Sequence, residues 1–335
     1  MADFSLVAAS AILDRCIGRR VVVVGDVFLD EYLVGRPERL SREGPVPVLA
    51  FERRFCVPGG AANPTRNLAA LGAVALQVGV VGADDAAGEL RRALGADGID
   101  LAGLVVAPDR PTIQKTRVVA AGLSAPQQVA RIDRQDRTPI SGAVETAVIA
   151  ALHRLAATAD AVLVSHYRSG VVTPAVCDAA RAAARARGVW LTVDAQGDLE
   201  RFHGFDLVRV GRQDAAASLR RRLETEADFE AAARGLRAET GARVVMLGRG
   251  AEGMSVADEA GGYAVVRPAN VSEIFDVSGA GDTVIAVATL ALAADATVHE
   301  AVALSNYAAG FVVRKLGVAS PAAADVLAEI DGRAK

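Results

Sequence analysis

The residues with the clearest potential for chemistry lie at positions 276–283, DVSGAGDT. They run directly into an apolar stretch, 284–294, that predicts a buried helix. Gly279 and Gly281 allow the backbone to turn tightly and to approach a ligand closely. The free N–H groups and the dipole at the start of a helix bind anions, phosphates above all. Asp282 in that first turn could accept a proton from an attacking hydroxyl, or it could only stabilise the helix N-terminus.

Two further clusters of glycines and polar residues could bind a polyhydroxylated ligand. Residues 58–63, PGGAAN, combine close backbone approach at Gly59 and Gly60 with Asn63, which offers both donors and an acceptor. The structural alternative is a simple glycine turn before a helix. Residues 25–30, GDVFLD, place carboxylates at the end of a predicted strand, where they could accept hydrogen bonds from sugar hydroxyls. These acids could equally serve as turn or capping residues.

Several familiar motifs are missing or lack the context that they require. Residues 248–253 spell GxGxxG, but the stretches 254–256 and 263–266 that follow predict strands, whereas a dinucleotide site needs a helix there. The sequence holds no GxxxxGK[ST], so we do not expect a P-loop protein. The four histidines show no paired metal spacing, and the three cysteines form no CxxC. We therefore expect no metal-binding residues.

The composition limits the class of protein. The chain has 335 residues, 52% hydrophobic and 23% charged, which excludes intrinsic disorder, collagen and coiled coil. A net charge of −3 and only 4% aromatic residues argue against nucleic-acid binding. Because no signal peptide and no apolar window of membrane-spanning length is evident, we expect no membrane partner. Few and scattered cysteines fit a reducing compartment, so we expect a cytoplasmic protein.

The elements that must position these residues alternate along the chain. Short apolar runs, each closed by a glycine or polar residue, predict buried strands at 21–24, 75–81, 161–164, 189–193, 207–210 and 243–247. Helical patterns lie between or after them at 61–71, 85–94, 143–156, 174–187, 228–240, 279–294, 299–315 and 321–330. Such alternation predicts an α/β fold with a mostly parallel sheet covered on both faces. Ligands of such sheets bind beyond the carboxyl ends of the strands.

Two stretches interrupt this alternation. Residues 31–58 are rich in proline, and residues 112–131 hold two short β-like runs around a turn. Unstructured loops of this length are uncommon, so we expect one small accessory sheet that projects from the body. We treat residues 1–335 as a single domain that includes this sheet.

Taken together, these strings resemble the ribokinase-like (PfkB) sugar kinases. The resemblance covers about residues 21–330 and implies a three-layer sandwich with a small β-sheet lid. Within the family, the chain looks most similar to the kinases of D-glycero-β-D-manno-heptose 7-phosphate. The segments that carry this likeness are 21–30, 39–48, 111–118, 274–284 and 306–317. Some members of that subgroup continue into a nucleotidyltransferase domain; only the kinase part is represented here, so we expect no such activity.

The resemblance implies transfer of the γ-phosphoryl group of ATP, with Mg²⁺ bridging its phosphates, to a sugar hydroxyl, O1 in the heptose case. Asp282 would be the base, and the anion hole would be formed by Gly279, Ala280 and Gly281. The residues that bind the substrate would be Asp30, Gly59, Gly60, Asn63, Lys115 and Arg117. The last two could hold a substrate phosphate or simply lie on a solvated strand face. The nucleotide would lie against Gly248, Gly250, Gly253 and Asn306, and the lid would mediate a homodimer.

The chain also departs from the resemblance at several polar positions. Relatives usually carry other residues at His166, Ser169, Gln196, Gly211 and Gly248, and Pro64 lies early in the helix expected to contact the sugar. The alternative function is therefore a catalytically weakened relative that binds sugar phosphate or nucleotide as a sensor or partner. Since the missing groups include a lysine and an asparagine, we expect the backbone of the glycine turn to bind the transferred phosphate, with side-chain cations contributing little.

Overall fold

A nine-stranded sheet forms the centre of the computed structural model, which describes residues 4–122, 126–269, 277, 279–315 and 317–332. From one edge to the other its strands are β13 (Tyr263–Val266), β12 (Met254–Asp258), β11 (Val244–Gly248), β10 (Leu207–Val210), β9 (Trp190–Ala195), β8 (Ala161–His166), β1 (Arg20–Gly25), β4 (Val74–Val81) and β5 (Asp100–Val106). The strands from β11 to β5 are parallel, whereas β12 runs antiparallel to both of its neighbours, β11 and β13. The carboxyl ends of the parallel strands therefore meet at one edge.

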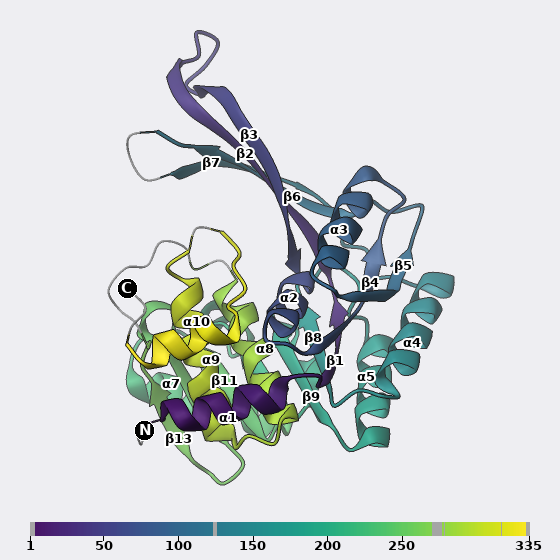
Figure 1. The fold of residues 1–335 in the computed structure, drawn as a ribbon, viewed down its shortest axis with the longest axis vertical. Coiled ribbons are helices and arrows are strands. Elements are labelled where there is room, and N and C mark those ends of the chain that lie inside the picture. Colours follow the sequence, from purple (N-terminus) through teal and green to yellow (C-terminus); the bar gives the residue numbers. More distant parts are fainter. Residues whose placement is uncertain (1–3, 123–125, 270–276, 278, 316, 333–335) are drawn as a thin grey trace.

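Helices cover both faces of this sheet (Figure 1). One face packs against α1 (Leu6–Cys16), α2 (Ala62–Ala70), α3 (Asp85–Ala96), α8 (Ala280–Ala293), α9 (Val298–Val312) and α10 (Ala323–Ile330). The other packs against α4 (Gly142–Ala156), α5 (Pro174–Arg187), α6 (Arg212–Ser218) and α7 (Glu226–Thr240). The four valines of β1 show why: Val21 and Val23 join the first core, while Val22 and Val24 join the second. A strand buried on both faces needs apolar residues at every position.

The predicted accessory sheet is present as a second, four-stranded sheet, which we call the small sheet. Its strands are β3 (Pro47–Gly60), β2 (Val27–Leu40), β6 (Ile113–Ala120) and β7 (Gln127–Arg134), in that spatial order. Strands β2 and β6 are parallel, and the other neighbours are antiparallel. The small sheet projects from the body in Figure 1. The first segment runs from Val27 to Gly60, where 31–58 was predicted, and the second runs from Ile113 to Arg134, where 112–131 was predicted.

Three elements of the body were not predicted. Helix α1 is amphipathic and capped by the Ser5 hydroxyl, which accepts a hydrogen bond from the Ala8 N–H. Strand β5 lies at the sheet edge and is only partly buried, so its pattern is weak. Helix α6 has seven residues, too few for a clear helical period. None of the helices within the described ranges has the length and apolarity needed to cross a membrane.

Candidate active site

The glycine turn and the start of α8 lie where the sequence predicts them. The described part of the motif comprises Val277 and residues 279–283, while residues 276 and 278 lie outside the described residues. Gly279 is the N-cap of α8, with φ of +80°, a left-handed conformation that favours glycine. A Cβ there would also lie 2.7 Å from Asn63 Nδ2. The turn therefore needs glycine for its conformation and for the approach of Asn63.

Asp282 is buried in the first turn of α8 and accepts two side-chain hydrogen bonds. The Tyr167 hydroxyl donates to Oδ1 at 2.5 Å, and Asn63 Nδ2 donates to Oδ2 at 2.8 Å. Burial raises the pKa of Tyr167 well above its usual range, so its hydroxyl keeps the proton that it donates. A carboxylate has about four acceptor sites, so Asp282 can still accept a hydrogen bond from a substrate hydroxyl.

The surroundings of Asp282 raise its pKa to about 7, first through burial and then through the nearby charge of Asp194. The hydrogen bonds from Tyr167 and Asn63 and the charge of Arg209 act in the opposite direction. A general base is most effective when its pKa lies near the working pH. The side chain is therefore suited to accept a proton at neutral pH.

Arg209 and Asp194 form an ion pair beside this carboxylate. They occupy paired positions on the parallel strands β10 and β9, and Arg209 Nη1 donates to Asp194 Oδ1 at 2.8 Å. A Cβ on Gly281 would lie 2.4 Å from Arg209 Nη1, so the guanidinium packs directly against the glycine turn. Neither Arg209 nor Tyr167 was predicted as a site residue from the sequence. A charged residue in the apolar run 207–210 was the available signal for the arginine.

A polar cavity in front of Asp282 brings together every residue expected to bind the substrate. Its lining includes Asp30, Gly59, Gly60, Asn63, Lys115 and Arg117, together with Tyr167, Asp194, Gln196, Arg209, Gly279, Gly281 and Asp282. We call this the acceptor cavity. Gly59 is required by close approach, because a Cβ there would lie 2.1 Å from Asp30 Oδ2.

The two cations of β6 face this cavity instead of lying on a solvated strand face. Arg117 Nη1 donates to Asp30 Oδ1 at 2.6 Å, and both side chains are mostly buried. Lys115 Nζ lies 3.9 Å from the centre of the Phe28 ring. Burial lowers the pKa of Lys115, and the charge of Asp30 opposes that shift. The cavity therefore contains a carboxylate for hydroxyl groups and cations for an anionic group.

The two acids of segment 25–30 serve different purposes. Asp30 lines the acceptor cavity, whereas Asp26 is fully buried and accepts hydrogen bonds from the backbone N–H groups of Tyr167, Ser169 and Val171 at 2.8–3.1 Å. Asp26 thus fits the structural alternative. It fixes the segment after β8, which carries Tyr167 toward Asp282.

A second, largely apolar cavity lies on the other side of the glycine turn. It contains all four residues expected beside the nucleotide, namely Gly248, Gly250, Gly253 and Asn306. Met246, Met254, Ala309 and Val313 contribute apolar surface. Arg209 and Gly281 line both this cavity, which we call the nucleotide cavity, and the acceptor cavity. The two cavities therefore meet beside the glycine turn.

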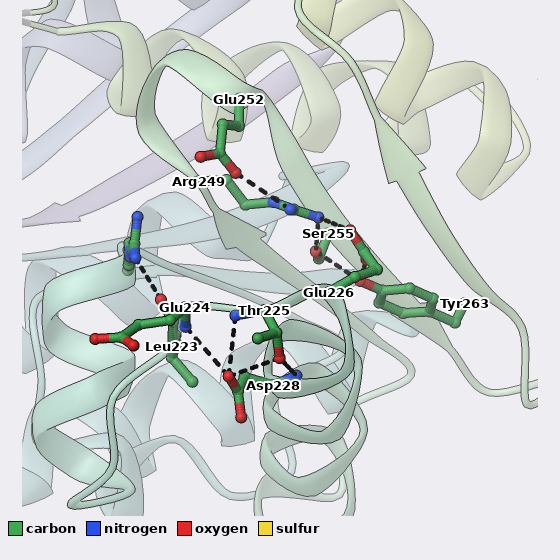
Figure 2. A network of polar contacts seen from close by, with 10 residues as sticks. Leu223, Glu224, Thr225, Glu226, Asp228, Arg249, Glu252, Ser255 and Tyr263 are labelled. Carbon is green, nitrogen blue, oxygen red and sulfur yellow. Dashed lines mark hydrogen bonds and ion pairs between the residues drawn. The ribbon is translucent and has the colours of Figure 1, made fainter.

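A polar network surrounds Arg249, whose chain neighbours Gly248 and Gly250 line the nucleotide cavity (Figure 2). Arg249 donates to Glu226 at 2.7 Å and to Glu252 at 3.2 Å, and its guanidinium lies 4.2 Å from the centre of the Phe229 ring. Tyr263 adds hydrogen bonds to Glu226 and to Ser255. Strands β12 and β13 follow this GxGxxG, as predicted, after a short 3₁₀ turn that was not predicted, so the motif does not open the helix of a dinucleotide site.

Comparison with known proteins decides the family. The sequence pattern of the pfkB family of carbohydrate kinases matches residues 19–325. The chain belongs to this family. It is 42% identical over 314 residues to the bifunctional protein HldE of Caulobacter vibrioides, and 39% identical over 323 residues to that of Citrifermentans bemidjiense. The alignments cover 93% and 96% of this chain but 63% and 65% of those relatives, so the chain spans less than two thirds of their length.

Solved structures confirm the three-layer fold. Phosphofructokinase-2 from Escherichia coli, in complex with potassium, matches 95% of this chain and 100% of its own, with a TM-score of 0.79 and 19% identity. Arabidopsis thaliana ribokinase, complexed with ribose and ATP, matches 94% of this chain and 99% of its own, with a TM-score of 0.74 and 17% identity. At such low identity the likeness shows the fold alone.

The structure shows what surrounds each position at which this pfkB chain departs from the pattern expected for its relatives. His166 is buried, packs edge-on against Phe202 and lies 3.8 Å from Asp198, and burial lowers its pKa. The Ser169 N–H donates to Asp26, and Gly211 is the N-cap of α6. Of the remaining departures, Gln196 lines the acceptor cavity, Gly248 lines the nucleotide cavity, and Pro64 lies in the first turn of α2, where proline is tolerated.

The pH dependence of activity should reveal the coupling between Asp194 and Asp282. In Asp194→Asn the negative charge that raises the pKa of Asp282 is removed, and Arg209 is left to act on Asp282 alone. The acid limb of kcat/KM, expected near pH 7 in the wild type, should therefore move to lower pH. A pH–rate profile of both proteins measures this shift. An unchanged acid limb would show that Asp282 is not the group that titrates.

Proposed function

We propose that this chain transfers the γ-phosphoryl group of ATP to a sugar hydroxyl, with Asp282 as general base. The observation that carries the proposal is the junction at Gly281, where the polar acceptor cavity and the apolar nucleotide cavity meet beside the base and the N-terminus of α8. Phosphoryl transfer needs the acceptor, the base and the phosphate brought into line, with little further chemistry from the protein.

Mg²⁺ would enter as the MgATP complex and neutralise charge on the β- and γ-phosphates. Across the described residues, no group of three or more His, Cys, Asp or Glu side chains is placed to hold a metal ion. The buried carboxylate at the junction, Asp194, is already paired with Arg209. Because Mg²⁺ keeps waters and binds through substrate phosphates, the nucleotide itself would supply its main ligands.

For the acceptor, we propose D-glycero-β-D-manno-heptose 7-phosphate, phosphorylated at O1. The resemblance of segments such as 111–118 to kinases of this sugar supports the choice. So do Lys115 and Arg117, because two cations in the acceptor cavity match an acceptor that already carries one phosphate. ATP consumption against a panel of sugars and sugar phosphates tests the proposal, and activity confined to unphosphorylated sugars would contradict it.

Lys115→Met should weaken binding of the phosphorylated acceptor selectively. A hydrogen bond to a charged group contributes about 1.5–3 kcal/mol, so KM for the sugar phosphate should rise roughly 10–100-fold, while KM for ATP stays unchanged. Lys315→Met is the matched control, because Lys315 packs near Phe311 and lines neither cavity. Equal effects of both variants, or a rise in KM for ATP alone, would remove Lys115 from the acceptor site.

We also propose that the small sheet acts as a lid over the acceptor and pairs with a second copy of the chain. The support is a set of large apolar side chains left exposed on it, namely Leu40, Val46, Phe51, Val129 and Ile132. Exposed apolar surface of this kind marks interaction sites. Sedimentation should give twice the chain mass of 34.5 kDa, and a monomer at micromolar concentration would contradict the pairing.

A further inference from the structure

Arg209 is an unusual residue for its place in the sheet. It lies on β10, whose other residues, Leu207, Val208 and Val210, are almost fully buried. Placing a guanidinium in such a strand is costly unless it is paired, and replacement of buried ion pairs by apolar residues is often neutral or stabilising. The pair with Asp194 therefore does not explain by itself why an arginine is present.

The free surface of Arg209 faces the two cavities. Its side chain is 21% exposed, against 2% for Asp194, and it lines both the acceptor cavity and the nucleotide cavity. Arginine carries five N–H donors in a planar fork. The bond to Asp194 uses one face of that fork and fixes its direction, which leaves other donors for a ligand.

The guanidinium also adjoins the backbone anion site. Arg209 Nη1 and Nη2 would lie 2.4 and 2.5 Å from a Cβ on Gly281, so the side chain covers the first turn of α8. An anion bound at this helix N-terminus between the two cavities would meet backbone N–H groups and a guanidinium together. Arginine binds phosphate oxygens in a bidentate manner, and such charge-assisted bonds are the strong ones.

We propose that Arg209 is a further catalytic residue, whose guanidinium contacts the phosphoryl group while it is transferred. This inference rests on the proposed function. In the transfer, the acceptor oxygen forms a bond to the γ-phosphorus as the bond from that phosphorus to the bridging oxygen breaks. The acceptor proton passes to Asp282, and ADP leaves with the electron pair of the broken bond. Arg209 donates to the non-bridging oxygens, and Asp194 positions it.

This proposal differs from our expectation that side-chain cations contribute little. Backbone donors and a side-chain cation would act on the same oxygens, in a site partly shielded from water, where fixed donors have large effects. The opposite reading also has a physical basis, because a guanidinium seated against Gly281 could obstruct the phosphate site. Removal of the side chain distinguishes the two.

Arg209→Ala should lower kcat by on the order of 10²–10³-fold, with KM for the acceptor nearly unchanged. Removal of the charge of Arg209 raises the pKa of Asp282 above its wild-type value of about 7, so rates should be compared on the alkaline plateau of each protein's pH–rate profile. Guanidinium chloride at low millimolar concentration should restore part of the activity of Arg209→Ala but none of that of Asp282→Asn. Arg212→Ala, whose side chain donates to the Leu223 carbonyl and lines neither cavity, is the control.

The double variant Arg209→Ala/Asp194→Asn guards against a loss caused only by an unpaired buried carboxylate. If Arg209 acts on the phosphoryl group, the double variant stays as slow as Arg209→Ala although its stability recovers. If the double variant regains wild-type activity, or if Arg209→Ala is faster than the wild type, the inference is wrong.

A binding measurement separates this inference from the proposed function. Titration calorimetry with ADP, with and without aluminium fluoride as a stand-in for the phosphoryl group, should show tighter binding with fluoride in the wild type and no such gain in Arg209→Ala. If the wild type transfers phosphate, and Arg209→Ala keeps both this activity and the tighter binding of ADP with fluoride, only the role of Arg209 is overturned. A wild type that shows the gain but phosphorylates no sugar would overturn only the proposed function.

Discussion

Asp282→Asn should lower kcat by about 10²–10⁴-fold, the usual contribution of a general base, and leave nucleotide binding nearly unchanged. The amide has the shape of the carboxylate but cannot accept the proton of the acceptor hydroxyl. Its two neighbours can still be satisfied: Asn63 can donate to the amide oxygen, and the Tyr167 hydroxyl can turn to accept from the amide nitrogen. Steady-state kinetics with ATP and the sugar phosphate measures the loss.

The same variant should be more stable than the wild type at pH 8. Because the pKa of Asp282 rises from 3.8 to about 7 on folding, the folded state binds its proton more tightly than the unfolded state does. The stability linked to this proton is present below about pH 4 and is lost as the pH rises toward 7. Asparagine removes that loss. Thermal melts of both proteins at pH 5 and pH 8 check whether the variant gains stability relative to the wild type as the pH rises. In the kinetic test, full activity of the variant would exclude Asp282 as the base.

The main features of the site could be predicted from the sequence because each depends on local backbone geometry. A glycine pair at the start of an apolar helix sets the position of the proposed anion site wherever the helix packs. The strands end in glycine or polar residues, and the parallel order of such a sheet gathers these ends at one edge. Lys115 and Arg117 were expected from the resemblance to the family, and both line the acceptor cavity from β6. The acceptor and nucleotide cavities therefore contain the predicted residues.

Contacts between distant segments could not be predicted in this way. Tyr167 donates to Asp282 across 115 positions of sequence, and its direction depends on the three backbone bonds that Asp26 accepts. The pairing of Arg209 with Asp194 depends on the register between β10 and β9. A sequence shows that such polar residues exist near strand ends, but the register decides which of them meet.

Gly281→Val should lower kcat by about 10²–10³-fold, the cost expected when a donor to the transferred phosphate is lost. The left-handed backbone of the turn lies at Gly279 and not at Gly281, so the variant should fold without backbone strain. The nearest atoms to the new Cβ belong to the guanidinium of Arg209, which is paired with Asp194 and would have to shift. The branched side chain would then displace the guanidinium and cover the N–H groups of the first turn. Steady-state kinetics measures the loss of kcat, and a thermal melt measures whether the variant folds normally.

Arg212→Ala is the comparison that decides whether the phosphate site lies at this turn. Arg212 lies on α6, and its guanidinium is 5.3 Å from the centre of the Phe229 ring, so its loss should change the rate only modestly. If Arg212→Ala proves far more damaging than Gly281→Val, the anion hole has been assigned to the wrong place. A double-mutant cycle with Arg209→Ala separates the two effects of valine. If Gly281→Val acts only by displacing Arg209, it adds no further loss in that background, whereas any additional loss measures the backbone donors themselves.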